Sequence, residues 1–270
     1  MKITVGYLQY KPERGKVERN LEKVNSLLHD VSFDLLVLPE LAFSGYFFIT
    51  PDELMPFADS GFSSKPAKYL RDLSKTRNSA IIAGFAEAAD GVLYNSQYAF
   101  LPDGSAVVYR KSHLFYKEKK VFCKGNTGPV ILDFRGVKVG MMVCFDWFFP
   151  EFSRILALKG AHILALSANL VLPGLGQRGM MVRSIENRVF SIVANRTGSE
   201  TSSEGEGIKF TGLSQICTPA GEIVAFSDED AEEVKTIEID TADAENKWIT
   251  PLNNLIEDRR EDLYRGLLDD

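Results

Sequence analysis

Apolar and polar residues follow two different patterns along the chain, and the change from one to the other predicts an α/β protein. Residues 17–30 (VERNLEKVNSLLHD) repeat apolar side chains at helical spacing. Residues 33–40 (FDLLVLPE) form a nearly continuous apolar run of strand length, which is typical of a strand buried on both faces. The helical pattern returns over residues 66–78, 150–161 and 178–188.

The middle and the end of the chain are rich in predicted strands. Turn residues such as Asp90-Gly91 and Pro102-Asp103-Gly104 separate the apolar runs. Strands that alternate with helices at both ends, with hairpins between them, predict mixed sheets covered by helices in a layered α/β architecture. The predicted strands cover residues 2–9, 79–88, 92–101, 105–111, 129–134, 137–144, 162–167, 189–195, 213–219, 222–227 and 233–240.

Composition narrows the class of protein. The chain has 270 residues and is 45% hydrophobic, which suffices for a large core and excludes a disordered or fibrous protein. Its net charge of −6 offers no basic field for nucleic acid. No linker, charge shift or repeat divides residues 1–270, so we expect one domain.

Features of membrane, secreted and metal-binding proteins are missing from the pattern. The longest apolar runs fall short of the roughly 20 residues that cross a bilayer, and the N-terminus lacks the apolar core of a signal peptide. Three cysteines, odd in number and widely spaced, argue against a disulfide framework. Neither CxxC nor HExxH occurs, so no metal is expected. We predict a cytoplasmic protein that acts without membrane or nucleic-acid partners.

The end of the chain differs from the rest. Residues 247–270 are highly charged yet carry large apolar side chains, including Trp248, Leu252 and Leu263. A short segment of this kind cannot bury much apolar surface by itself. We expect it to pack across an interface between copies of the chain.

Three polar residues each follow an apolar strand: Glu40, Lys111 and Cys144. The carboxyl ends of strands in open α/β sheets bind ligands, so the three can converge if their strands run in the same direction. A thiol, a carboxylate and an ammonium make a catalytic set: Cys144 as nucleophile, Glu40 as its base and Lys111 as oxyanion stabiliser. Taken singly, each residue has an ordinary structural explanation, as a small core side chain or a surface charge.

Other residues compete for these roles. Cys123 lies among lysines that can lower a thiol pKa, while Cys217 lies inside a predicted core strand. His113 follows Lys111 closely and is an alternative base. Residues 174–179 match the dinucleotide pattern G-x-G-x-x-G, but they do not directly follow a strand and are better interpreted as a loop before a helix.

At these positions the sequence resembles the nitrilase superfamily of carbon–nitrogen hydrolases. The resemblance spans essentially the whole chain. It is carried by residues 34–46 (DLLVLPELAFSGY), 109–126 (YRKSHLFYKEKKVFCKGN) and 139–151 (VGMMVCFDWFFPE), with support from 183–198 and 258–264.

The resemblance implies a four-layer α-β-β-α sandwich that pairs through helices into a homodimer or larger assembly. It implies the same roles for Glu40, Lys111 and Cys144, and it makes Glu118 the candidate for a second glutamate, structural or catalytic, after the lysine. Tyr46, Trp147 and Asn169 fall where members line the pocket, and the backbone N–H of Phe145 is expected to face the substrate oxyanion. Core packing is an equally good interpretation of the aromatic residues.

The expected reaction is hydrolysis of a small amide or carbamoyl compound through a thioester, with no cofactor. Conversion of small aliphatic nitriles to acid and ammonia is the close alternative, because the resemblance includes both activities. A catalytically silent binding or scaffold protein on the same fold is the alternative of another class. The presence of all three reactive residues argues against it.

Overall fold

Two mixed β-sheets, each of six strands, face each other in the computed structural model, which describes residues 1–267. The first sheet has the order β14-β1-β2-β3-β4-β5, with bounds Glu233–Asp240, Lys2–Gln9, Leu35–Val37, Ala80–Ala89, Val92–Phe100 and Ala106–Arg110. The second has the order β13-β12-β9-β8-β7-β6, with bounds Ile223–Phe226, Gln215–Cys217, Phe190–Ala194, Ile163–Ser167, Val137–Val143 and Ile131–Phe134.

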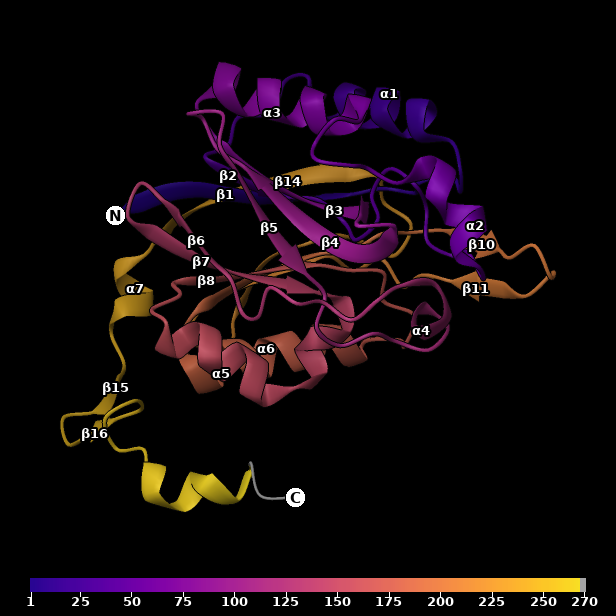
Figure 1. Cartoon of the computed structure of the whole chain (residues 1–270). Coiled ribbons are helices and arrows are strands. Elements are labelled where there is room, and N and C mark those ends of the chain that lie inside the picture. Colours follow the sequence, from indigo (N-terminus) through magenta and orange to yellow (C-terminus); the bar gives the residue numbers. More distant parts are fainter. Residues whose placement is uncertain (268–270) are drawn as a thin grey trace.

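Helices cover the outer face of each sheet. Helices α1 (Val17–Leu28) and α3 (Lys65–Arg77) lie over the first sheet, and α5 (Pro150–Leu158) and α6 (Leu175–Asn187) lie over the second (Figure 1). The apolar stripe predicted for the first of these helices turns Val24 and Leu28 inward. The α-β-β-α sandwich expected from the sequence is therefore confirmed.

The layer between the two sheets is apolar. One cluster of buried side chains joins Val5 and Val37 of the first sheet to Val139, Ile163 and Ile192 of the second. Because this cluster buries the inner face of each sheet and helices cover the outer face, the central strands read as continuous apolar runs. The sheets are thereby fixed relative to each other, and so are the residues at their edges.

Within each sheet, strand direction brings the predicted site residues to the same end, beyond the carboxyl ends of the strands. β1, β2 and β3 are parallel, β3 and β4 are antiparallel, and so are β4 and β5. The strands that precede Glu40 and Lys111, β2 and β5, therefore run the same way. In the second sheet β7, β8 and β9 are parallel, so Cys144 and Asn169 follow neighbouring parallel strands.

The structure also contains elements that the apolar pattern did not predict. They include the helices α2 (Pro51–Leu54), α4 (Glu118–Val121) and α7 (Ala242–Glu245), the 3₁₀ helices Met55–Phe57 and Cys144–Phe148, and the hairpin of β10 (Ser199–Thr201) and β11 (Gly207–Lys209). All are short and lie outside the regular alternation. Their positions depend on contacts with the sheets more than on local periodicity.

The glycines of residues 174–179 have a packing role, and their interpretation as a loop is wrong. Helix α6 already begins at Leu175. A Cβ at Gly176 would collide with the side chain of Leu170, and a Cβ at Gly179 would collide with the indole of Trp147. These glycines let α6 lie close to residues that surround Cys144.

The end of the chain leaves the body of the molecule (Figure 1). It forms β15 (Trp248–Thr250), β16 (Asn253–Asn254) and the 3₁₀ helix Glu261–Leu267, with Trp248, Leu252 and Leu263 exposed. Of the predicted interface segment 247–270, residues 268–270 lie outside the described part. The division into one domain and an interface tail stays a prediction. No helix within residues 1–267 has both the length and the apolar character needed to cross a membrane.

Candidate active site

Glu40 follows β2 and is completely buried. Gly84 of β3 makes room for it, because a Cβ at Gly84 would collide with the Glu40 backbone. The Asn95 amide donates to Glu40 Oε1 at 2.6 Å. Glu40 Oε2 is buried too, yet within residues 1–267 it has no hydrogen-bond partner. One oxygen of this carboxylate is thus held and the other is open to a proton donor.

Lys111 connects Glu40 to a second carboxylate. Its Nζ lies 2.7 Å from Glu40 Oε1 and 2.8 Å from both oxygens of Glu118. All three side chains are buried. We call Glu40, Lys111 and Glu118 the charged cluster. A buried ammonium between two carboxylates is a fixed positive charge that needs no rearrangement to meet a negative one.

Glu118 is held by the short helix α4 and by a tyrosine. The Tyr46 hydroxyl donates to Glu118 Oε1 at 2.8 Å, and the Phe115 N–H donates to Oε2 at 3.1 Å. The loop carrying Tyr46 is itself fixed. The backbone N–H groups of Tyr46 and Phe47 donate to the Glu200 carboxylate at 3.0 and 2.7 Å. Tyr46 therefore contacts the charged cluster.

Cys144 begins the turn that follows β7 and has a left-handed backbone, with φ of 40°. A non-glycine residue in this region carries strain of about 1–3 kcal/mol and needs support from its surroundings. Buried Asp146 provides it, accepting hydrogen bonds from the N–H of Val143 at 2.9 Å, the Tyr109 hydroxyl at 2.7 Å and His113 Nδ1 at 2.7 Å. The sharp turn ends the strand at the thiol.

The buried setting shifts the ionisation of all three reactive groups. Burial raises the pKa of Glu40 to about 7, against the opposing effect of Lys111. Burial, and then the nearby Glu40 carboxylate, raise the pKa of the Cys144 thiol well above its usual range. Burial lowers the pKa of Lys111, but Glu118 and Glu40 outweigh it and the net pKa is raised. At neutral pH the arrangement is a thiol, an ammonium and a carboxylate that can take up a proton.

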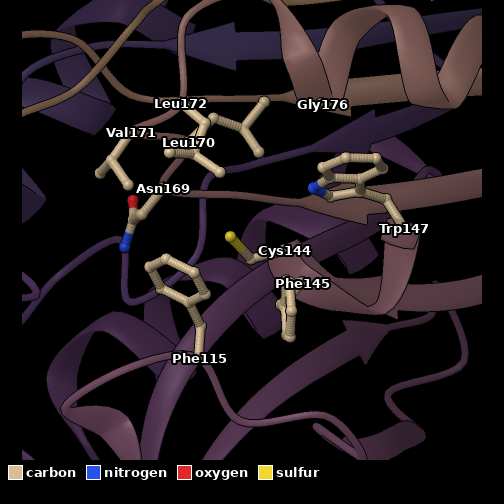
Figure 2. A pocket seen from close by; sticks show the side chains of 9 residues that line it. All are labelled: Phe115, Cys144, Phe145, Trp147, Asn169, Leu170, Val171, Leu172 and Gly176. Carbon is tan, nitrogen blue, oxygen red and sulfur yellow. The ribbon is translucent and has the colours of Figure 1, made fainter. Parts of the chain in front are cut away.

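The Cys144 thiol opens into a small pocket (Figure 2). Its cavity volume is about 20 Å³, roughly the room of one water molecule. In Figure 2 the thiol projects into the space between the Asn169 carboxamide and the Trp147 indole. The walls are mostly apolar and come from Phe115, Cys144, Phe145, Trp147, Asn169, Leu170, Val171, Leu172 and Gly176.

The predicted site residues divide between two places. Phe145, Trp147 and Asn169 line the pocket with Cys144. Tyr46 is not among its lining residues and bonds to Glu118 instead. The substrate-binding role expected for Tyr46 stays a prediction. The charged cluster and the pocket meet at the thiol, since Glu40, Lys111 and Glu118 all shift its pKa.

The competing residues lie elsewhere or are engaged. Cys123 is exposed, and Cys217 is buried in β12, where burial raises its pKa to about 11. The His113 ring bonds to Asp146 and stacks on Phe149 with ring centroids 3.8 Å apart. No group of three His, Cys, Asp or Glu within residues 1–267 could hold a metal ion.

Sequence reasoning missed several contributors. Asn95 lies inside β4, where alternation alone makes it an ordinary strand residue, yet it bonds to Glu40. Phe115 and the segment 170–172 line the pocket, and Asp146 holds the turn of Cys144. The sequence held one signal for Asp146, which lies two residues after the candidate nucleophile and inside an apolar run. A carboxylate buried there needs hydrogen-bond partners, and this could have predicted a supporting role.

Comparison with known proteins places the chain among enzymes that cleave carbon–nitrogen bonds. The family model described as carbon-nitrogen hydrolase matches residues 4–247. A nitrilase from Pyrococcus abyssi (strain GE5 / Orsay) is 40% identical over 265 residues, covering 97% of this chain and 99% of that protein. A 2-oxoglutaramate amidase from Bacillus subtilis (strain 168) is 32% identical over 272 residues, covering 98% and 100%. The crystal structure of a carbon–nitrogen hydrolase from Helicobacter pylori G27 has a TM-score of 0.87 and 28% identity, covering 100% of this chain and 99% of that one.

Proposed function

The chain belongs to the carbon–nitrogen hydrolase family, within the nitrilase superfamily, and we propose that it hydrolyses a non-peptide C–N bond of a small amide or carbamoyl compound. The observation that carries this proposal is the state of Glu40. One oxygen is held by Lys111 and Asn95, while the other is buried and without a partner in the described chain. A buried carboxylate whose pKa lies near neutrality is matched to the work of a general base.

In the first half of the reaction Cys144 Sγ attacks the carbonyl carbon as Glu40 takes the thiol proton. The carbonyl oxygen becomes an oxyanion, which the Lys111 ammonium and the backbone N–H of Phe145 stabilise. Donors placed in advance in this way are each worth about 3–4 kcal/mol. The C–N bond then breaks, the departing nitrogen takes the proton from Glu40, and a thioester remains on Cys144.

The second half returns the enzyme to its starting state. Glu40 removes a proton from water as the water oxygen bonds to the thioester carbon. The C–S bond breaks, and the sulfur recovers the proton from Glu40 as the acid leaves. Each proton is passed by the same carboxylate, so Glu40 must be able to both accept and release one. A pKa of about 7 suits both tasks.

Nitrile hydrolysis is the second candidate, and the 40% identical relative named a nitrilase supports it. A nitrile would be attacked at its carbon to give a thioimidate. Water would then release ammonia and leave the same thioester. The charged cluster would serve both substrates in the same way, so the choice between them rests with the pocket. The homodimer and the cytoplasmic location stay predictions from the sequence.

The test is ammonia release from a panel of small amides, carbamoyl compounds and aliphatic nitriles, with C144A beside the unaltered protein. We expect amide or carbamoyl turnover, and a loss of at least about 10⁴-fold in kcat in C144A, because the nucleophile is removed. C123A is the matched control: Cys123 is exposed, so its loss should leave turnover unchanged.

The possible outcomes separate the candidates. Turnover confined to nitriles would make the protein a nitrilase. Full activity of C144A would refute the assignment of the nucleophile. An inactive protein whose Cys144 also fails to react with iodoacetamide would be the silent binding protein of the same fold.

A further inference from the structure

Asn169 is a buried polar side chain that nothing in residues 1–267 satisfies. It is 2% exposed, and neither its Oδ1 nor its Nδ2 has a hydrogen-bond partner in this part of the chain. Leaving a buried donor or acceptor unpaired costs about 1–3 kcal/mol for each group. Such a side chain in a native structure calls for an explanation, and a group on a ligand is one.

The backbone around Asn169 is fixed on both sides. The N–H of Ala168 donates to the Ala194 carbonyl at 2.9 Å, and the N–H of Leu170 donates to Asn195 Oδ1 at 2.9 Å. Asn195 is itself fully buried. The main chain at Asn169 is therefore fixed, and burial confines its carboxamide, whose two polar atoms are unused. A binding group needs this combination of a fixed position and free bonding capacity.

The carboxamide lies beside the reacting atoms. Asn169 lines the same pocket as Cys144, and its backbone N–H is near enough to the sulfur to lower the thiol pKa. Figure 2 shows its amide on the side of the thiol opposite Trp147. Apart from Cys144 and the indole N–H of Trp147, the other side chains of the wall are hydrocarbon. Among the side chains of the wall, Asn169 alone offers a strong donor and a strong acceptor.

Charge around the pocket limits what Asn169 can receive. Among the groups that shift the thiol pKa, Lys111 is the one cation, and two carboxylates already hold it. With both carboxylates ionised, the charged cluster carries one net negative charge, so a further carboxylate on the substrate would be repelled. A neutral group with a donor and an acceptor, such as a carboxamide, would pair with Asn169 without that penalty.

We propose that Asn169 selects substrates with a neutral polar group on the acyl side, one or two bonds from the reacting carbonyl, over substrates that carry an apolar or an anionic group there. This inference rests on the proposed hydrolysis at Cys144 and specifies its substrate class. The carboxamide of Asn169 pairs with the neutral group through one donated and one accepted hydrogen bond.

Three amides of the same shape test it. Malonamide, 3-methylbutanamide and malonamate place a carboxamide, an isopropyl group and a carboxylate at the same position. We expect kcat/KM at pH 8 to follow the order malonamide, 3-methylbutanamide, malonamate. In N169L, whose side chain has nearly the same shape but no polar atoms, the preference for malonamide over 3-methylbutanamide should fall at least about tenfold. The ratio between variants cancels the intrinsic reactivity of each amide.

L172A is the matched control, since Leu172 lines the same pocket without polar atoms. It should change kcat/KM for malonamide and 3-methylbutanamide by similar factors. An equal loss for both substrates in N169L would mean that Asn169 acts on the scissile group, which overturns the inference. A preference of the unaltered protein for malonamate would overturn it too.

A second measurement separates this inference from the proposed function. Each compound is tested for protection of Cys144 against alkylation by iodoacetamide, read on the Cys144 peptide by mass spectrometry. Malonamide should protect best, and N169L should abolish its advantage even if no compound is turned over. Selective protection without turnover would count against hydrolysis but support the role of Asn169. Protection by none of the three would overturn the inference.

Discussion

The charged cluster and the pocket wall form the two sides of the candidate site, and they differ in polarity and in how far their polar groups are hydrogen-bonded. The charged cluster lies at the edge of the first sheet, and each of its members is held by hydrogen bonds at 2.6–2.8 Å. The pocket wall comes mostly from the end of the second sheet and is apolar, and its one carboxamide has no partner within residues 1–267. The difference suggests a division of work: the charged cluster drives the reaction, and the pocket selects the substrate.

This division would explain why relatives of similar sequence carry names for different substrates. A charged cluster that only moves protons and stabilises an oxyanion treats amides and nitriles alike. Selection would then fall to side chains such as Asn169 and to the shape of the segment 170–172, which line the pocket. Loops can change without disturbing the sheets that hold the reactive groups.

The strongest test of the division is K111M. The change removes the ammonium while keeping much of the side-chain volume, so the oxyanion loses a donor and the two carboxylates lose their shared partner. We expect kcat to fall by about 10²–10³-fold with little change in KM, measured by ammonia release. Circular dichroism and a melting curve show whether the buried site still folds.

The opposite pattern for K111M would break the division. A raised KM with kcat preserved would make Lys111 a binding residue. N169L is the matched variant from the pocket, and it should change the ratio between substrates rather than the rate for all of them. If both variants lowered every rate alike, the two sides would not be separable.

The next largest effect is the dependence of the rate on pH. Glu40 must be ionised to take the thiol proton, and its pKa is about 7. Below pH 7 the protonated form predominates, so kcat/KM should fall about tenfold per pH unit. Lys111 and Cys144 have raised pKa values, so neither should cause a loss just above neutrality. The profile is measured with the best amide of the panel.

The variant E118Q tests whether the acid limb of the pH profile belongs to Glu40. The Glu118 carboxylate raises the pKa of Glu40, so its removal should move the acid limb to lower pH while the amide keeps most contacts. Y46F removes only the hydroxyl that bonds to Glu118 and serves as control, with a smaller shift. An acid limb near pH 4.5 in the unaltered protein would show that burial does not raise the pKa of Glu40. A limb that E118Q does not move would leave Glu118 a purely structural role.

Most helices and strands could be predicted from the sequence, because buried strands and amphipathic helices leave strong periodic signals. The four-layer sandwich was implied by the resemblance to a known family. Glu40, Lys111 and Cys144 could be found because each ends an apolar strand, where a polar residue stands out. Asn95 could not, because its contact with Glu40 depends on the register of β3 and β4, which pairs Asn95 with Ala86. The hairpin β10–β11 and helix α4 are too short and irregular to leave a periodic signal.

The smallest effect on the turnover rate should come from changes to the C-terminal segment, which is exposed where the site is buried. The family match ends at residue 247, and there the Lys247 ammonium donates to the carbonyls of Asn187 and Arg188 at 3.0 and 2.8 Å. Beyond it Trp248, Leu252 and Leu263 are exposed at 48%, 86% and 65%. Several large apolar side chains exposed together on one short segment are typical of an interaction surface, which supports the proposal that the segment packs on a second copy.

Truncation after Lys247 tests this proposal while keeping the anchor at the end of α6. Light scattering should report a smaller assembly than that of the full chain, because the apolar side chains that join the copies are gone. The rate per Cys144 should stay within about twofold, since both sides of the site lie within residues 40–176. An unchanged assembly would remove the interface role from the segment. A large loss of rate in a protein that still folds would mean that assembly supports the site, so the division between reaction and selection would have to include the partner copy.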